Sequence, residues 1–90
     1  MSDIKNVERI LKALANRRRL AIVMYLKRER IAKVGAIADN IKLSFKATSK
    51  HLAVLYSADI VEREQKGLEM MYTLSPSLSP IVKLISNSLE

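Results

Sequence analysis

Residues 44–55 read Ser-Phe-Lys-Ala-Thr-Ser-Lys-His-Leu-Ala-Val-Leu. Ser44 is a favourable N-cap and the leucines recur at helical spacing, so the stretch predicts a helix over residues 45–58. Lys46 and Lys50 stand one turn apart near the helix start and fall on its outward side. At about 100° per residue, the buried side is expected to hold Phe45, Thr48, Leu52 and Leu55. The stretch therefore predicts an amphipathic helix with two exposed lysines.

A shorter helix is predicted immediately before this one, over residues 34–40, with Ile37 and Ile41 facing inward. Only residues 41–44 remain between the two helices. Two helices joined by a turn of about four residues are the signature of a helix-turn-helix.

Two further helices are predicted upstream. Residues 4–14 carry an apolar stripe at steps of three and four, formed by Ile4, Val7, Ile10, Leu11 and Leu14. Asn16 can cap a helix over about residues 17–29. The buried positions predicted for that helix are Leu20, Val23, Met24 and Leu26.

After Asp59 the pattern becomes alternating, which predicts a two-stranded hairpin with its turn at residues 66–67. Val61, Arg63 and Gln65 share one face of the first strand, and the return strand carries Met70, Tyr72 and Leu74. Ser79 and Pro80 then begin a last helix. Its apolar stripe consists of Leu78, Ile81, Val82, Ile85 and Leu89.

This order predicts a mainly α fold with a β-hairpin: a winged helix-turn-helix with one added helix at each end. We expect residues 1–90 to form a single domain, because 90 residues suffice for only one. Hydrophobic residues make up 49% of this short chain. Such a surplus suggests that part of the apolar surface is buried against a partner.

The chain is basic, with a formal net charge of +7. The excess lies in residues 1–30, which hold nine basic and three acidic residues, whereas residues 60–90 hold three and four. A basic excess favours anionic partners, namely nucleic acid, an anionic membrane or an acidic protein. Simple solubility is the alternative explanation.

Several functional classes find no support in the composition. The chain has no cysteine, which excludes disulfides, thiolate metal sites and cysteine nucleophiles. No apolar run approaches the roughly 18 residues of a membrane span, and the first residues do not resemble a signal peptide. We therefore expect a soluble, cytoplasmic protein with no membrane partner.

An enzyme is not expected, and neither is a cofactor. Ser49 and His51 are two residues apart on a helix and do not face each other. No glycine-rich phosphate loop, paired-carboxylate motif or metal-ligand spacing occurs. His51 is the single histidine, so a metal site is not expected; it is either a partly buried residue bonded to backbone or a contact to phosphate or base.

The sequence instead contains candidates for contact with DNA. On the helix over residues 45–58, Lys46 and Lys50 can reach bases or phosphates, and the small residues Ala47 and Ser49 allow close approach. Elsewhere, phosphate-holding or wing residues are expected at Arg17, Arg18, Arg63 and Lys66. A solvated helix start and an ordinary hairpin tip are the alternative explanations of these basic residues.

These residues resemble the ArsR-type winged-helix regulators over about residues 5–75. The matching positions are residues 11–16, Arg19, Leu20 and Ile22, then residues 44–55, then Ala58, Ile60, Val61, Arg63, Gly67 and residues 72–74. Each stretch alone is weak, but the two main stretches and the hairpin together are fairly specific.

The resemblance implies a homodimer whose first and last helices form the interface, through Ile4, Val7, Ile10, Leu11, Leu78, Ile81, Val82, Ile85 and Leu89. It also implies a double-stranded DNA partner, with a groove-facing set that comprises Ser44, Lys46, Ala47, Ser49, Lys50 and His51. Arg19 is implied to be structural or to contact phosphate.

The sequence departs from the family pattern in three respects. Asp59 stands where glycine is frequent, so the turn into the hairpin is expected to differ. Phe45 stands where a polar residue is usual, so direct base reading is not expected there. Metal-sensing members use cysteine pairs or His and carboxylates in the last helix, and residues 78–89 contain none of these.

Three hypotheses remain open at this point. The first is a dimeric, sequence-specific regulator, a repressor in the preferred version, that reads a palindromic site through residues 45–58. The second is a winged-helix module that binds an acidic protein, for example within a transcription complex or as an antitoxin. The third is a non-specific nucleic-acid-binding protein. The effector, if there is one, is not indicated.

Overall fold

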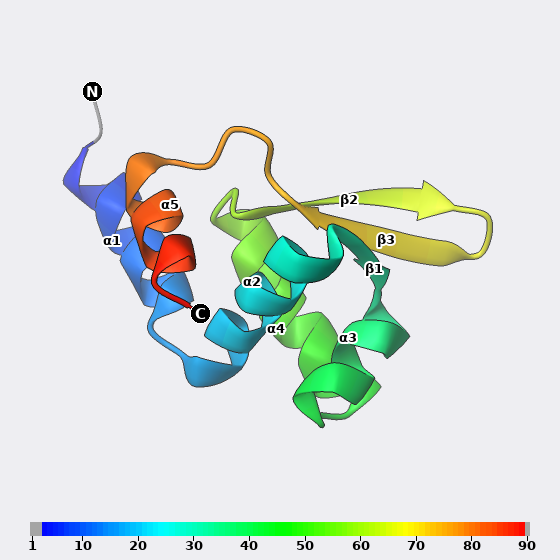
Figure 1. Ribbon diagram of the computed structural model, residues 1–90. Helices are drawn as coiled ribbons and strands as arrows, with labels where there is room; N and C mark the ends of the chain where they lie inside the picture. Colours follow the sequence, from blue (N-terminus) through cyan, green and yellow to red (C-terminus); the bar gives the residue numbers. More distant parts are fainter. Residues whose placement is uncertain (1–2, 90) are drawn as a thin grey trace.

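The computed structural model describes residues 3–89, so residues 1, 2 and 90 of the predicted domain lie outside the described part. The element order, shown in Figure 1, is α1 (Ile4–Leu14), α2 (Arg17–Glu29), β1 (Ile31–Lys33), α3 (Val34–Ile41), α4 (Phe45–Ser57), β2 (Val61–Lys66), β3 (Glu69–Leu74) and α5 (Pro80–Asn87). The predicted winged helix-turn-helix with an added helix at each end is confirmed. No helix within residues 3–89 is long and apolar enough to cross a membrane.

Side-chain caps fix where α2, α4 and α5 begin, as the sequence predicts. The side-chain oxygen of Asn16 accepts from the amides of Arg18 and Arg19, at 2.9 and 3.1 Å. The Ser44 hydroxyl accepts from the Ala47 amide at 3.1 Å, and Ser79 caps α5 directly before Pro80. Each cap satisfies a backbone donor that the first helical turn leaves free.

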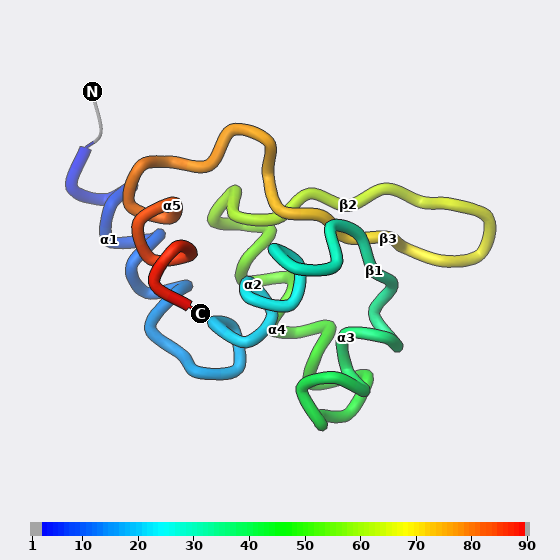
Figure 2. Tube along the Cα trace, viewed as in Figure 1, coloured from blue at the N-terminus to red at the C-terminus, as the bar shows by residue number. Residues whose placement is uncertain are grey.

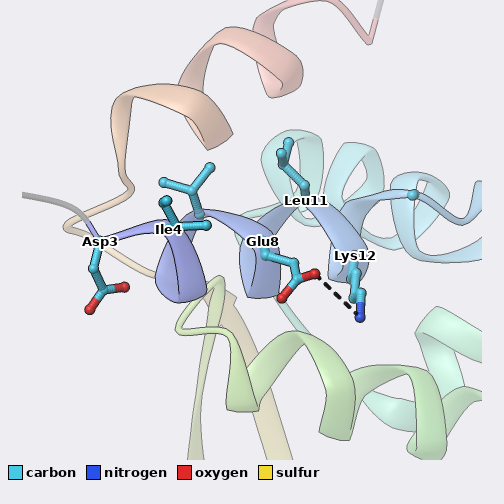
Figure 3. A pocket seen from close by; sticks show the side chains of 7 residues that line it. Asp3, Ile4, Glu8, Leu11 and Lys12 are labelled. Atoms are coloured by element: carbon cyan, nitrogen blue, oxygen red, sulfur yellow. Dashed lines mark ion pairs between the residues drawn. The ribbon is translucent and has the colours of Figure 1, made fainter.

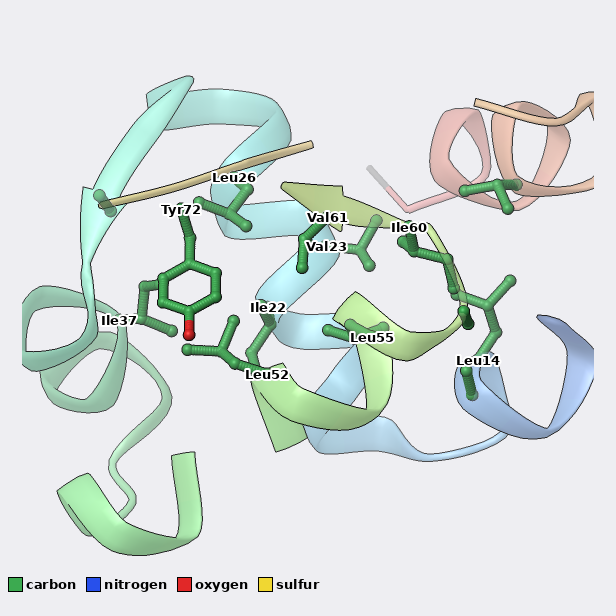
Figure 4. Close-up of a cluster of buried hydrophobic side chains, with 14 of the residues drawn as sticks. Leu14, Ile22, Val23, Leu26, Ile37, Leu52, Leu55, Ile60, Val61 and Tyr72 are labelled. Atoms are coloured by element: carbon green, nitrogen blue, oxygen red, sulfur yellow. The ribbon is translucent and has the colours of Figure 1, made fainter. Parts of the chain in front are cut away.

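The core forms around α2, which contacts all four other helices as well as β1 and β3. Figure 4 shows side chains from the helices and the sheet meeting in one cluster. Its largest fully buried members are Ile22, Leu26, Ile37, Leu52, Leu55 and Ile60. The prediction that Met24 is buried is wrong: the inward side of α2 centres on Ile22, and Met24 projects about 200° away from it and is exposed.

The sheet has three strands in the order β1-β3-β2, all antiparallel, so the prediction of a two-stranded hairpin is incomplete. The missing strand is β1, whose Ala32 pairs with Tyr72 at the centre of β3. The predicted pairing of the two hairpin strands is confirmed, with Val61 opposite Leu74 and Arg63 opposite Tyr72, but every residue of β2 after Val61 is exposed. The third strand anchors the stem of the hairpin to the helical body.

Arg19 joins three helices through its guanidinium group. It donates to the carbonyl oxygens of Ala13 at 2.6 Å and Lys12 at 3.3 Å, both in the last turn of α1. It also contacts Nδ1 of His51 in α4 at 3.1 Å. With Arg19 as the donor, Nδ1 must be the acceptor, so this contact requires the neutral ring. Arg19 therefore has the structural role that the family resemblance implies.

The pKa of His51 is lowered from its ordinary value of 6.5, first by partial burial and then by the nearby charges of Arg19 and Arg18. The unfolded chain consequently takes up this proton at a higher pH than the folded chain. The stability that the neutral ring contributes is present above pH 6.5 and is lost as the pH falls through the lowered pKa.

We therefore expect thermal unfolding followed by circular dichroism to show a falling Tm between about pH 7.5 and pH 5.5, above the range where most carboxylates titrate. The His51→Gln variant keeps a side-chain acceptor but cannot titrate, so its Tm should change less over the same range. Parallel pH profiles for the two proteins would contradict this assignment.

In the described part of the chain, three residues other than glycine adopt a positive φ: Arg30 (77°), Lys42 (57°) and Asp59 (59°). Asp59 thus makes the turn into the hairpin in the left-handed conformation that glycine favours and that Asp tolerates. Arg9 in α1 donates to the Ser57 carbonyl and lies 3.3 Å from the Asp59 carboxylate. Arg30 ends α2 with a ψ of −51°, a combination that is strained for any residue with a side chain.

Replacing Arg30 with glycine is expected to raise the free energy of unfolding by about 1 kcal/mol, because glycine removes the strain. For a domain of this size the Tm should rise by about 4–8 °C. Arg30→Ala removes the same charge but keeps a Cβ at the strained position, so it should not be stabilising. Equal Tm values for the two variants would show that the gain in stability comes from removing the charge and not from relieving backbone strain.

Candidate nucleic-acid interface

The orientation of α4 is fixed by the side it buries. Thr48, Leu52 and Leu55 are completely buried, which turns the opposite side of the helix to the surface. The Thr48 hydroxyl is the one buried side-chain polar atom within residues 3–89 that has no hydrogen-bond partner. Its burial shows how tightly this side of α4 is held against the core.

Lys46 and Lys50 are both exposed on the first two turns of α4, as predicted. Neither has an ion-pair partner in the described part of the chain. Ala47 and Ser49 are half-buried between them, and Ser44 is exposed at the cap. The structure therefore brings these five candidates together at the start of one helix.

The other predicted DNA-contacting residues on the helices differ in whether their side chains already have hydrogen-bond partners within the protein. Arg17 is exposed at the start of α2. The Arg18 side chain donates to the Ile41 carbonyl at 3.0 Å and so supports the end of α3. His51 is half-buried and bonded to Arg19, not to backbone. Arg18 and His51 thus act within the fold, whereas Arg17 remains available to a partner.

The two predicted hairpin residues lie in different places. Lys66 is close to the tip, 3.7 Å from the Glu64 carboxylate. The Arg63 guanidinium stacks on the Tyr56 ring, 3.9 Å from its centroid, at the base of the hairpin. Tyr56 follows Lys46 by ten residues, which is about 15 Å along the helix. The structure does not bring Arg63 to the lysine cluster.

Three exposed residues near the start of α4 were not among the sequence candidates. Lys42 lies in the turn before the helix, Leu68 is fully exposed at the hairpin tip, and Phe45 is 63% exposed. The prediction that Phe45 is buried is wrong. Phe45 precedes Thr48, the first buried residue of α4, and does not belong to the core cluster. Figure 2 shows the hairpin tip on the side of the molecule away from α1 and α5.

A separate apolar face runs along α1. In Figure 3, Ile4 and Leu11 project together from the helix, and the Glu8–Lys12 ion pair at 3.7 Å borders them. Ile4 is 87% exposed, and Val7 is half-buried beside it. Ile10, a predicted interface residue, is instead buried inside the protomer and has almost no surface left for a partner.

The outer side of α5 is also apolar. Leu84 is 70% exposed, although the predicted stripe did not include it, and Ile81 is half-buried one turn before it. Val82 is buried within the protomer, so the predicted stripe was mainly the inward side of the helix. The remaining predicted positions, Leu78, Ile85 and Leu89, are half-buried and pack against the core.

No group of three or more metal-ligating side chains occurs within residues 3–89.

The chain matches known proteins over most of its length. The model of the bacterial regulatory protein, arsR family, matches residues 16–63, which include the whole helix-turn-helix. The transcriptional activator HlyU of Vibrio cholerae is 38% identical over 66 residues, 73% of this chain and 60% of the activator. The transcriptional repressor PagR of Bacillus anthracis is 31% identical over 78 residues, 86% of this chain and 78% of the repressor.

Solved structures agree with these matches. Reduced HlyU from Vibrio cholerae superposes with a TM-score of 0.80 at 34% identity, over 94% of this chain and 85% of that chain. The homodimeric winged helix-turn-helix DNA-binding domain of a possible ArsR-family regulator from Mycobacterium bovis superposes with a TM-score of 0.81 at 29% identity. This match covers 98% of this chain and 83% of that chain. The chain belongs to the arsR family of bacterial regulatory proteins and has the fold of its winged helix-turn-helix transcriptional regulators.

Proposed function

We propose that this chain is one DNA-binding domain that forms a homodimer, binds a palindromic double-stranded site through α4, and represses transcription in the cytoplasm. The observation that carries the proposal is the pair of exposed lysines on the first two turns of α4, Lys46 and Lys50, neither of which has an ion-pair partner among residues 3–89.

The geometry of α4 suits the major groove of DNA. That groove is about 12 Å wide and admits one α-helix, whose first turns approach the base edges. Ala47 and Ser49 are short enough to let the helix backbone come close, and the lysines on either side can reach phosphates or guanine acceptors. Arg17 and Lys66 would add contacts to the phosphate backbone, from the start of α2 and from the wing.

The apolar faces of α1 and α5 support the homodimer. Ile4 and Leu84 are large, apolar and mostly exposed, and α1 and α5 lie on the side of the molecule away from the hairpin tip (Figure 1). Burial of such surfaces against a second copy would remove them from water and leave both α4 helices free. A two-fold dimer reads a two-fold symmetric site, with half-sites about one helical turn apart. The homodimeric domain from Mycobacterium bovis gives independent support.

Repression is the proposed direction because PagR, the relative that the chain matches over the larger share, is a repressor, although HlyU is an activator. Transcription in vitro from a promoter that carries the bound site distinguishes the two. Added protein should lower the transcript level, and a rise would assign the chain to the activators.

Selection of bound duplexes from a random pool at about 150 mM salt should recover one palindromic motif. The Lys46→Ala/Lys50→Ala double variant should bind this motif at least tenfold more weakly, because it loses its two major-groove cations. The matched control, Lys5→Ala/Lys83→Ala, removes the same charge from exposed positions on α1 and α5 and should bind almost as well as wild type.

Two other outcomes would point elsewhere. A pool that stays random, with binding that disappears steeply as salt rises, would assign the chain to non-specific nucleic-acid binding. The absence of any duplex binding at this salt concentration would favour the protein-interaction module.

The Ile4→Glu/Leu84→Glu variant is expected to be monomeric by sedimentation, because a charge in an apolar interface must be desolvated without a partner. Its dimer dissociation constant should rise at least tenfold, which is about 1.4 kcal/mol. Leu68→Glu changes a leucine that is still more exposed and lies on the opposite side of the molecule, so it should leave the dimer intact. If the double variant stays dimeric, the interface lies elsewhere.

A further inference from the structure

Phe45 is the one phenylalanine in the chain, and it is not used in the core. It is the first residue of α4, and 63% of its surface is exposed. Leaving a large apolar side chain in water forgoes the stabilisation that burial would give. Its position directly before Lys46 places the exposed ring at the edge of the surface that is proposed to enter the major groove.

The surroundings of Phe45 show which side of the helix it faces. It lines an open cleft of about 410 Å³ between α3, α4 and the hairpin, together with Val34, Gln65, Leu68 and Met70. The two charged residues of the lining, Lys33 and Glu69, form an ion pair at 3.3 Å. Neither Lys46 nor Lys50 lines this cleft, so the ring flanks the lysine pair on the hairpin side. The ring therefore lies between the two elements that are proposed to contact DNA, α4 and the wing.

The partner that fits this position is DNA. The chemical groups in the major groove of DNA indicate which of them the phenyl ring can contact. Lys42 and Lys46 are exposed close to Phe45 in the sequence, which favours a polyanion over an apolar protein surface. A phenyl ring has no hydrogen-bonding group with which to read a base edge. The apolar group that base pairs present in the major groove is the C5-methyl of thymine.

We infer that Phe45 is a specificity-determining residue that packs against a thymine methyl, so each half-site contains one thymine that is read through its methyl group. This inference rests on the proposed function of α4 and goes beyond it by naming the base and the side chain. It also revises the expectation from the family pattern, under which an apolar residue at this position reads no base.

Deoxyuridine lacks only the C5-methyl group and pairs as thymidine does, so it isolates the proposed contact. In the duplex recovered by selection, each symmetric pair of thymidines is replaced in turn with deoxyuridine, and binding is measured by fluorescence anisotropy. One pair should weaken wild-type binding by about fourfold per half-site, roughly 15-fold in all, as expected for losing the burial of one methyl group in each half-site.

Two variants assign this loss to the phenyl ring. Phe45→Ala should bind the thymidine and deoxyuridine duplexes equally, because it has nothing to place against the methyl group. Leu68→Ala removes another exposed apolar side chain that lines the same cleft, and it should keep the discrimination. Both positions are largely exposed, so both variants should fold, which circular dichroism checks.

Repeating the selection with Phe45→Gln provides a second readout. Glutamine can bond to adenine through N6 and N7, so the selected base at this one position should change from thymine, with the rest of the motif retained.

The failures of this inference and of the proposed function are distinguishable. If selection recovers no motif, both are wrong. If a motif is recovered but the deoxyuridine scan is flat, or the penalty persists in Phe45→Ala, the proposed function stands and the thymine contact is wrong. Equal loss of discrimination in Leu68→Ala would also overturn the assignment to Phe45.

Discussion

The burial of one side of α4 is the constraint on which the surface of this protein depends. Thr48, Leu52 and Leu55 are fully enclosed, and Arg19 holds His51 on the flank of the same helix. With these contacts in place, α4 cannot rotate about its axis without exposing its leucines or breaking its link to α1 and α2. The exposed face of the helix is therefore set by the core and not by its own side chains.

The helices could be predicted from the sequence because their caps and apolar spacing are local signals. Asn16, Ser44 and Ser79 each precede a periodic stretch, and each caps a helix in the structure. The strand β1 could not be predicted, since three residues are too few to show an alternation. Its strand character depends on pairing with β3, forty residues further along the chain, which no local pattern reveals.

The site was predictable in part. The exposure of Lys46 and Lys50 was predicted from their positions around the helix axis, opposite the buried leucines. The same geometry failed for Phe45, because a wheel projection ignores where the core ends along the axis. It also failed for α5, where Val82 is buried within the protomer and Leu84 is exposed. This helix has apolar residues on two sides, and their spacing does not indicate which side packs against the rest of the chain. The sequence also did not reveal that Arg18 donates to the Ile41 carbonyl or that Arg63 stacks on the Tyr56 ring. Both contacts depend on how the fold brings different elements together.

The short strand β1 has a mechanical consequence. Lys33 is both its last residue and the N-cap of α3, while Ala32 is paired to Tyr72 in the hairpin. The hairpin stem and the helix-turn-helix are thus joined by continuous backbone at one end and by a hydrogen-bonded ladder at the other. Neither can swing independently, so the spacing between them is preorganised. A partner that engages both elements loses little of its binding free energy to ordering them.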